Sequence, residues 1–368
     1  MGWSSLALCV AGDWHRPKIN QEEQVNSVSR KALAAVAMAS ASLLVLSGCA
    51  SPKPGAGYIA CGVSDEGSWT DKSFNESVMD GLMKAKDELG VDVKDAESNS
   101  SEDYETNLTS MIAAKCNVIF AVGFGLIDPV NTAADANPDF NFVTIDGYSK
   151  GATNLKPVTY KVQESSYLAG YAAASYSSTK ILGVYGGAQY DSVTGFMDGF
   201  YYGAKAYEAE TGTRVTVLGW DPVTKTGDFI GGFAPNDPVG KTIAAGQLDA
   251  GADVLMPVGG NQYGALSEAI SEAGKDAKMV GVDKNWSLLP EFKDMMLTSI
   301  EKRMTTAVFE IIKAGAVDKT AFTGDAYEGT LANDGTALSE TEFITGDLKT
   351  KLDELKAGII DGSINPLS

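Results

Sequence analysis

The chain has 368 residues, with 48 acidic and 29 basic side chains and a formal net charge of −19 at pH 7. This length predicts two domains with substantial cores, and the acidic charge argues against nucleic acid or anionic lipid as a surface partner. The single histidine, His15, lies near the amino terminus, so the rest of the chain lacks the commonest general base and metal ligand. This disfavours catalysis without excluding it. We expect no metal, no cofactor and no catalytic residue.

Residues 1–48 predict a lipoprotein signal peptide. Two basic residues precede an apolar run over 32–46, and the sequence L-S-G-C follows and ends at Cys49. Cleavage before Cys49 would leave its thiol to carry lipid, which would anchor the protein on the extracytoplasmic face of the cell membrane. Residues 49–57 would then form a flexible tether. The mixed composition of residues 1–24 predicts that the start is over-extended.

Strand and helix patterns alternate from residue 58 onward. Short apolar runs bounded by turns predict strands, and apolar residues at helical spacing predict helices. Alternation of this kind predicts a parallel sheet covered by helices on both faces. The first predicted strands occupy 57–63, 91–95, 117–122 and 141–145, and the first predicted helices occupy 74–89, 101–114, 128–136.

The same alternation then repeats, which predicts a second lobe. Its strands are expected at 158–162, 181–185, 215–220, 252–258 and 279–282, and its helices at 165–176, 191–210, 239–250, 263–273. We expect a strand at 296–300 and a helix at 303–314 to return to the first lobe, and a helix at 349–359 to lie in the second. The predicted lobes are 58–160 plus 287–325, and 161–286 plus 326–368.

Two cysteines, Cys61 and Cys116, lie inside apolar runs of the first lobe. Because both occupy positions typical of strands rather than loops, we expect two buried free thiols, with a disulfide as the alternative.

The loop over residues 67–75 reads G-S-W-T-D-K-S-F-N and lies between the first strand and the first helix. Such loops lie at the carboxyl ends of parallel strands, where α/β sheets collect their ligands. Its aromatic, acidic, hydroxyl and amide side chains therefore predict a ligand-binding loop. The alternative is an ordinary polar loop in which Phe74 enters the core and Asp71 caps the helix.

Five motifs resemble those of one known family. The loop just described resembles a G-x-x-x-D-x-S-F-N signature, and T-I-D-G at 144–147 resembles a strand-end V-D-G. Q-E-S-S-Y-L-A-G at 163–170 resembles E-x-S-F-L-A-G, G-A-D-V-L-M-P-V-G-G at 251–260 resembles V-I-F-P-V-A-G-G, and G-V-D at 281–283 recurs unchanged. Together, and in this order, they resemble the basic membrane protein (BMP) family of ABC-transporter substrate-binding lipoproteins, which includes purine nucleoside receptors of the PnrA type.

This resemblance covers almost all of the chain after the leader. It implies an α/β, two-lobed type I periplasmic-binding-protein fold, each lobe a parallel sheet flanked by helices. It also implies a monomeric protein, not an enzyme, that binds a purine nucleoside such as adenosine, guanosine or inosine between the lobes and delivers it to ABC permease subunits.

The resemblance further implies aromatic stacking of the base between the lobes. In the first lobe Phe74 matches the signature phenylalanine, and Trp69 is an alternative wall. In the second lobe Phe233 is the leading candidate and Phe196 the reserve. Stacking and burial of these faces would supply most of the affinity.

Polar groups implied by the resemblance would orient the ligand. Asp146 would accept hydrogen bonds from the base, Asp283 would accept them from the ribose hydroxyls, and Lys302 would donate to the ribose. The remaining expected contacts come from Asp71, Ser73 and Asn75 in the first lobe, and from Gly259 and Gly260, which let the backbone approach the sugar.

The chain departs from the family pattern at the edge of the expected pocket. Lys284, Asn285 and Trp286 replace an acidic, glutamine-bearing run, and Asn261-Gln262-Tyr263 replaces a glycine-rich one. We expect Trp286 and Tyr263 to narrow the pocket.

Three other functions compete with the nucleoside importer. A type I sugar receptor would need an arginine in its binding site. It is disfavoured because Arg214 and Arg303 are the only arginines after the leader. A surface nucleoside sensor remains open. A nucleoside hydrolase with Asp146 and Asp283 as acid and base is disfavoured, because the chain lacks the amino-terminal aspartate cluster that would hold calcium.

Overall fold

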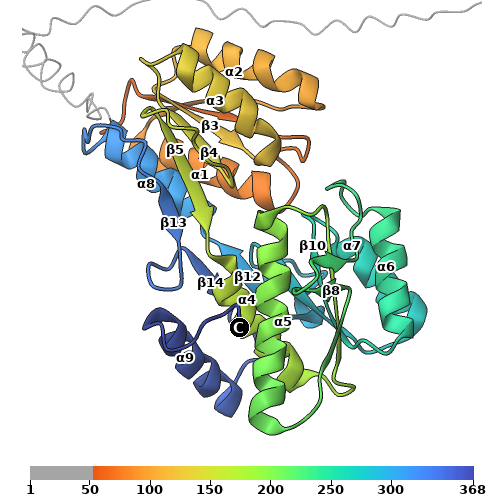
Figure 1. The fold of residues 1–368 in the computed structure, drawn as a ribbon. Helices are drawn as coiled ribbons and strands as arrows, with labels where there is room; N and C mark the ends of the chain where they lie inside the picture. Colours follow the sequence, from red (N-terminus) through yellow and green to blue (C-terminus); the bar gives the residue numbers. More distant parts are fainter. Residues whose placement is uncertain (1–52) are drawn as a thin grey trace, which may run out of the picture. The chain divides into compact units, whose positions relative to one another are not determined.

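The computed structural model describes residues 53–368, so the predicted leader and Cys49 lie outside the described residues. Helices and strands alternate along this range (Figure 1). The first lobe begins with β1 (Ile59–Val63), α1 (Phe74–Leu89), β2 (Asp92–Ala96), α2 (Tyr104–Ala113), β3 (Val118–Val122), α3 (Ile127–Ala136), β4 (Phe142–Ile145) and β5 (Leu155–Tyr160). Short 3₁₀ turns precede α2 at Ser101–Asp103 and α3 at Phe124–Leu126.

The second lobe follows the same plan. Its elements are α4 (Val162–Tyr176), β6 (Ile181–Gly186), α5 (Asp191–Thr211), β7 (Thr216–Leu218), α6 (Pro238–Asp249), β10 (Val254–Val258), α7 (Tyr263–Ala273), β11 (Lys278–Asp283) and β12 (Met296–Lys302). A small hairpin, β8 (Trp220–Asp221) with β9 (Thr226–Gly227), follows β7, and 3₁₀ turns at Trp286–Leu288 and Lys293–Met295 precede β12. The chain ends with α8 (Met304–Ala316), β13 (Tyr327–Gly329), β14 (Thr336–Leu338) and α9 (Gly346–Ile360).

Within residues 53–368 these strands form two six-stranded sheets and the hairpin. The first sheet has the order β13-β5-β4-β3-β1-β2 and is parallel throughout. Its central strand β3 is buried along its whole length. Alternate residues of β3 contact different helices: Phe120 packs in the core with α1 and α8, and Ile119 packs in the core with α2 and α3. Burial on both faces explains why this strand reads as a continuous apolar run.

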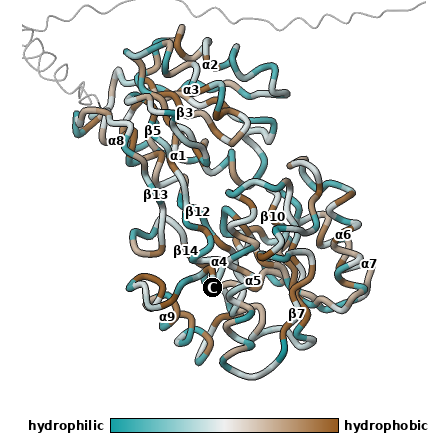
Figure 2. The backbone as a smooth tube through the Cα atoms, viewed as in Figure 1, coloured by the Kyte–Doolittle hydropathy of each residue, from teal (hydrophilic) through white to brown (hydrophobic). Residues whose placement is uncertain are grey.

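The second sheet has the order β14-β12-β11-β10-β6-β7, and only β14 runs antiparallel within it. Met256 of β10 packs in the core with α4 and α5, whereas Leu255 packs in the core with α6 and α7. The last helix, α9, is amphipathic, as the alternation of brown and teal along it shows in Figure 2. Its residues Leu352, Leu355 and Ile359 pack against α4.

The sheets differ from the predicted lobes at three strands. We expected the strand near 158–162 to open the second lobe, but β5 pairs with β4 in the first sheet. We expected the strand near 296–300 in the first lobe, but β12 pairs with β11 in the second sheet. Conversely, β13 falls in a stretch assigned to the second lobe, but it pairs with β5 in the first sheet. The chain therefore crosses between lobes after Lys302, not before Met296. Hydrophobic patterning reveals that a buried strand exists but not which sheet it joins, which explains these errors.

The expectation of free thiols is wrong, because Cys61 and Cys116 form a disulfide. Cys61 lies in β1, and Cys116 lies just before the neighbouring strand β3. Their Cα atoms are 6.0 Å apart, a separation typical of disulfides. Strand-like sequence at both positions did not exclude a bridge, because the two strands are adjacent in the sheet and both side chains enter the same core.

Part of the predicted tether is ordered against the domain. Gly55 is buried, and its N–H donates to the carbonyl of Leu89 at the end of α1, at 2.8 Å. Residues 53–57 therefore belong to the folded body.

No helix within residues 53–368 combines the length and the apolar composition needed to cross a membrane.

Candidate functional site

A pocket lies between residues at the carboxyl ends of strands from both sheets. In each sheet the strand order reverses beside this pocket, between β1 and β3 in the first and between β6 and β10 in the second. Connections that leave neighbouring strands toward opposite faces of a sheet open a crevice, and this is where α/β sheets bind ligands. Residues that follow these four strands line the pocket, namely Asp65, Phe124, Ser192 and Gly259.

Ten of the twelve predicted ligand-binding residues line the pocket: Asp71, Phe74, Asn75, Asp146, Phe196, Phe233, Gly259, Gly260, Asp283 and Lys302. The exceptions are Trp69 and Ser73. Asp65, Phe124, Ser192 and Asn261 also line the pocket and were not predicted.

Trp69 packs in the core of the first lobe and does not form a wall of the pocket. Its side chain is 7% exposed, and its ring lies against Gly62 of β1. Its backbone N–H donates to the Glu97 carboxylate at 3.1 Å, which fixes the loop at this point. The alternative in which Trp69 supplies the aromatic wall is therefore wrong, and Phe74 is the aromatic side chain that this loop presents to the pocket.

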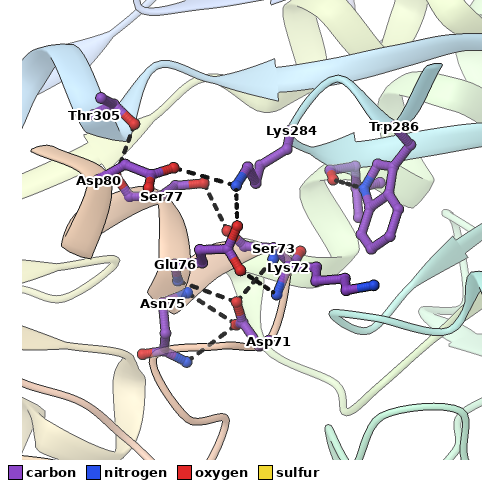
Figure 3. A network of polar contacts seen from close by, with 11 residues as sticks. Asp71, Lys72, Ser73, Asn75, Glu76, Ser77, Asp80, Lys284, Trp286 and Thr305 are labelled. Carbon is purple, nitrogen blue, oxygen red and sulfur yellow. Dashed lines mark hydrogen bonds and ion pairs between the residues drawn. The ribbon is translucent and has the colours of Figure 1, made fainter. Parts of the chain in front are cut away.

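Asp71 holds the loop and the start of α1 together. Its carboxylate accepts hydrogen bonds from the backbone N–H groups of Ser73, Asn75 and Glu76, at 2.8, 2.9 and 3.1 Å (Figure 3). The first N–H groups of a helix have no partner inside it, so a carboxylate at this position stabilises the helix end. Burial raises the pKa of Asp71, although these hydrogen bonds oppose the rise. Asp71 thus caps the helix, as the alternative interpretation of the loop proposed.

Asn75 lines the pocket, and its side chain carries a buried acceptor without a partner in the described chain. Its Nδ2 donates to Asp65 Oδ1 at 2.8 Å and to Asp71 Oδ2 at 3.3 Å. The two carboxylates define the orientation of the amide, because the reverse orientation would bring oxygen against oxygen. The Oδ1 atom is buried and has no hydrogen-bond partner within residues 53–368. A buried acceptor of this kind is costly unless a ligand donates to it.

Asp65 is positioned by tight backbone packing. Its Oδ1 accepts from the Gly67 N–H at 2.9 Å, and its Oδ2 lies against Gly123 at the end of β3. A Cβ atom at Gly123 would lie 2.2 Å from that oxygen, and Gly123 also has φ +101°. Only glycine satisfies both constraints. Burial raises the pKa of Asp65.

A buried charge cluster crosses the pocket between the lobes. Lys302 Nζ lies 2.5 Å from Asp146 Oδ2 and 3.7 Å from Asp283 Oδ1. Asp146 and Asp283 follow or end strands β4 and β11, and both have positive φ angles, 57° and 68°. Few non-glycine residues adopt this conformation, and it often marks functional sites. Ser73 contributes from behind the pocket, since its Oγ donates to Asp283 Oδ2 at 3.2 Å.

The electrostatics of this cluster favour a charged lysine. Burial alone would lower the pKa of Lys302, but the adjacent carboxylates of Asp146 and Asp283 outweigh it and raise the pKa. Burial raises the pKa of Asp283, and Lys302 opposes that rise. Two carboxylates facing one ammonium retain unused acceptor capacity, which suits a ligand rich in hydroxyl or N–H donors.

Aromatic rings from both lobes surround the cluster. Lys302 Nζ lies 5.2 Å from the centroid of the Phe74 ring and 5.1 Å from that of Phe196. Phe196 is 1% exposed and belongs largely to the core. Farther along the pocket, Phe124 lies 5.4 Å from Phe233 and stacks on Tyr190 with centroids 3.7 Å apart. Phe124 comes from the first lobe and the other two from the second, so these rings also bridge the lobes.

Tyr263 and Trp286 do not narrow the pocket, contrary to the expectation from sequence. Both are buried behind the end of β11, with their rings 4.0 Å apart. The Tyr263 hydroxyl accepts from the Val282 N–H at 2.7 Å, and Trp286 Nε1 donates to the Val282 carbonyl at 2.9 Å. These bonds fix the strand end that carries Asp283.

Within residues 53–368 no group of three or more His, Cys, Asp or Glu side chains is placed to hold a metal ion.

Comparisons with known proteins agree with this architecture. A family model described as "ABC transporter substrate-binding protein PnrA-like" matches residues 59–327. The chain is 31% identical to "ABC transporter nucleoside-binding protein BmpA" of Lactococcus lactis subsp. cremoris (strain MG1363), over 92% of this chain and 99% of that protein. It is 29% identical to "Basic membrane protein A" of Borreliella burgdorferi (strain ATCC 35210 / DSM 4680 / CIP 102532 / B31), over 81% of this chain and 85% of that protein.

A solved structure confirms the fold. The crystal structure of ABC transporter system solute-binding proteins from Aeropyrum pernix K1 matches with a TM-score of 0.72 at 24% identity, covering 84% of this chain and 92% of that one. With the two parallel sheets, this confirms the predicted α/β type I periplasmic-binding fold.

Proposed function

Since the chain belongs to the PnrA-like family of ABC transporter substrate-binding proteins, we propose that it binds a purine nucleoside in the pocket between its lobes. The family consists of binding proteins, so the chain is not an enzyme. The name of the Lactococcus relative identifies nucleosides as that protein's ligand. The chemistry of the pocket supports the same ligand class here.

The observation that carries this proposal is the buried Asp283–Lys302 pair beside the Phe74 ring. A ribose presents two adjacent hydroxyl groups, which need a carboxylate acceptor and tolerate a cationic donor. Asp283 accepts from both hydroxyls, and Lys302 donates to the sugar. The flat faces of Phe74 and Phe233 then cover the base, and the larger ring system of a purine gains most from that stacking.

We assign base recognition to Asn75 rather than to Asp146. Asp146 Oδ2 is held by Lys302 at 2.5 Å, which makes it part of the group around the ribose. Asn75 Oδ1 is a buried acceptor without a partner, the one of its kind in the described chain that belongs to a residue lining the pocket, and it is suited to an N–H group of the base. Gly259 and Gly260 let the backbone approach the ligand from the second lobe.

The sugar-receptor alternative is weaker. Within the described residues no arginine lines the pocket, and Arg303 instead faces Glu301 at 3.5 Å. A free sugar would also leave much of the aromatic lining without a partner. We further propose that the protein is monomeric, carries lipid on Cys49 and delivers its ligand to ABC permease subunits; a surface sensor would use the same pocket without a permease.

A thermal-shift panel tests the ligand class. A ligand that binds only the folded state at about 100 times its Kd stabilises it by about 2.7 kcal/mol, which raises the unfolding temperature measurably. We expect adenosine, guanosine or inosine to raise it, and ribose and glucose to leave it unchanged. A shift with sugars and none with nucleosides would overturn the proposal.

An Asp283→Asn variant tests whether Asp283 binds the ribose hydroxyl groups of the ligand. Loss of a charged acceptor should weaken inosine binding at least about tenfold. Inosine and 2′,3′-dideoxyinosine should be compared by calorimetry on both proteins. Because the dideoxy compound lacks both hydroxyls, its affinity should change little on substitution. Equal losses for the two compounds would remove Asp283 from the ribose contact.

A further inference from the structure

One basic residue beside the pocket ties the two lobes together. Lys284 Nζ lies 2.8 Å from Glu76 Oε1 and 3.3 Å from Asp80 Oδ2 (Figure 3). Glu76 and Asp80 lie one turn apart on α1, which covers the first sheet, whereas Lys284 follows β11 of the second sheet. These two ion pairs therefore connect the lobes and do not stabilise either lobe alone.

The pairs are partly shielded from water and well oriented. The side chains of Lys284 and Glu76 are 28% and 31% exposed, whereas that of Asp80 is 50% exposed. The second oxygen of Glu76 accepts from the Lys72 N–H at 3.1 Å, which directs the first oxygen toward Lys284. Burial lowers the pKa of Lys284, but the hydrogen bond to Glu76 and the charges of Asp80 and Glu76 outweigh it and raise the pKa. The ammonium therefore stays charged across the physiological range.

The same turn carries both the bridge and the pocket carboxylate. Asp283 has φ 68°, and the Lys284 N–H donates to the Val282 carbonyl at 2.8 Å, which makes a tight turn at the end of β11. Asp283 lines the pocket, and the next side chain contacts α1. The start of α1 also contacts Asp283 directly through Ser73 Oγ. A movement of α1 away from β11 would therefore break the bridge and displace groups around Asp283 together.

We propose that Lys284 is a positioning residue that sets ligand affinity by holding α1 of the first lobe against the end of β11 in the second. It touches no ligand itself. The identity of the ligand in this proposal rests on the proposed function. The bridge between the lobes does not depend on that function.

The test compares two lysine variants of the full folded protein. Lys284→Gln removes both pairs of the bridge and should weaken inosine binding about fivefold, because each partly exposed pair contributes a factor of about two to three. The loss should be seen mainly in a faster dissociation rate. The matched control is Lys241→Gln: Lys241 pairs with Glu272 and Glu268 at 2.8 and 3.1 Å and is 30% exposed, but all three residues lie in the second lobe. Its loss should leave affinity unchanged.

Salt provides a second readout that a purely structural role would not change. Raising ionic strength from about 0.05 M to about 0.5 M should weaken inosine binding by wild type about two- to threefold, because screening weakens charge pairs. Lys284→Gln should show a smaller dependence, and Lys241→Gln the wild-type dependence. Equal affinities and equal salt dependences for the two variants would overturn the proposal.

Small-angle scattering separates this proposal from the proposed function. Without any nucleoside, Lys284→Gln should increase the radius of gyration relative to Lys241→Gln, because the lobes separate more often. If wild type binds no nucleoside, the proposed function fails and scattering alone decides the role of Lys284; an unchanged radius then overturns it. If Lys284→Gln does not fold, the double variant Glu76→Gln with Asp80→Asn removes the same pairs from α1 and is expected to give the same results.

Discussion

Replacing Lys302 with methionine tests whether the buried charge cluster is held together by its single cation. The Lys302 side chain is 4% exposed, and its partners Asp146 and Asp283 are 8% and 9% exposed. Methionine fills a similar volume but leaves two buried carboxylates without their cation. Breaking a buried pair in this way costs about 3–5 kcal/mol of unfolding free energy near neutral pH.

This cost should depend on pH with a definite sign. Burial already raises the pKa of Asp283, and the Lys302 charge is the main effect that opposes it. Without that charge, the pKa of Asp283 in the folded protein rises further above its value in the unfolded chain. The folded variant then binds a proton that the unfolded chain releases, so its stability falls as pH rises through this range. The deficit should therefore be larger at about pH 7.5 than at about pH 5.

Urea unfolding of wild type and variant at both pH values measures the effect. The control is Lys161→Met, because Lys161 pairs with Glu328 at 2.9 Å and the two side chains are 43% and 49% exposed. An exposed pair contributes at most about 1 kcal/mol, so this control should be nearly as stable as wild type. A Lys302→Met variant as stable as the control at both pH values would refute the reasoning.

Two further substitutions test the frame that holds the pocket. Replacing both Cys61 and Cys116 with alanine removes a crosslink over 55 residues and should cost about 4 kcal/mol in urea unfolding, on the loop-entropy model; an unchanged midpoint would contradict it. Gly123→Ala forces a Cβ to within 2.2 Å of Asp65 at φ +101°, and it should lower the free energy of unfolding by about 2 kcal/mol or more. The control is Gly246→Ala in helix α6, where a Cβ would meet no atom within 4 Å. This control should not destabilise the protein.

Much of the fold could be predicted because its signals are local. The central strands are buried on both faces and read as continuous apolar runs, and the helices between them show helical spacing. Asp146 and Asp283 could be selected because they stand at strand ends, where parallel sheets bind ligands. The sheet to which β12 belongs could not be predicted, since strand pairing depends on contacts between distant parts of the chain.

The residues missed at the pocket differ in whether the sequence carried a signal for them. Asp65 also follows a strand by two positions, so the strand-end rule that selected Asp146 would have found it. Phe124 and Tyr190 gain their roles only through a contact across the lobes. Trp69 shows the opposite error: an aromatic residue in a binding loop was read as a wall, but Gly62 leaves space for its ring in the core.

The turn at Asp283 carries one residue whose role could be predicted from a sequence motif and one whose role could not. Asp283 belongs to a motif and points into the pocket, so its place could be predicted. Lys284 departs from that motif, yet it makes the ion pairs that join β11 to α1. A change beside a ligand-binding carboxylate can thus alter affinity without touching the ligand, because binding free energy includes the cost of bringing two lobes together. If that cost is what Lys284 lowers, its removal should weaken inosine and 2′,3′-dideoxyinosine by the same factor, whereas Asp283→Asn should weaken inosine alone.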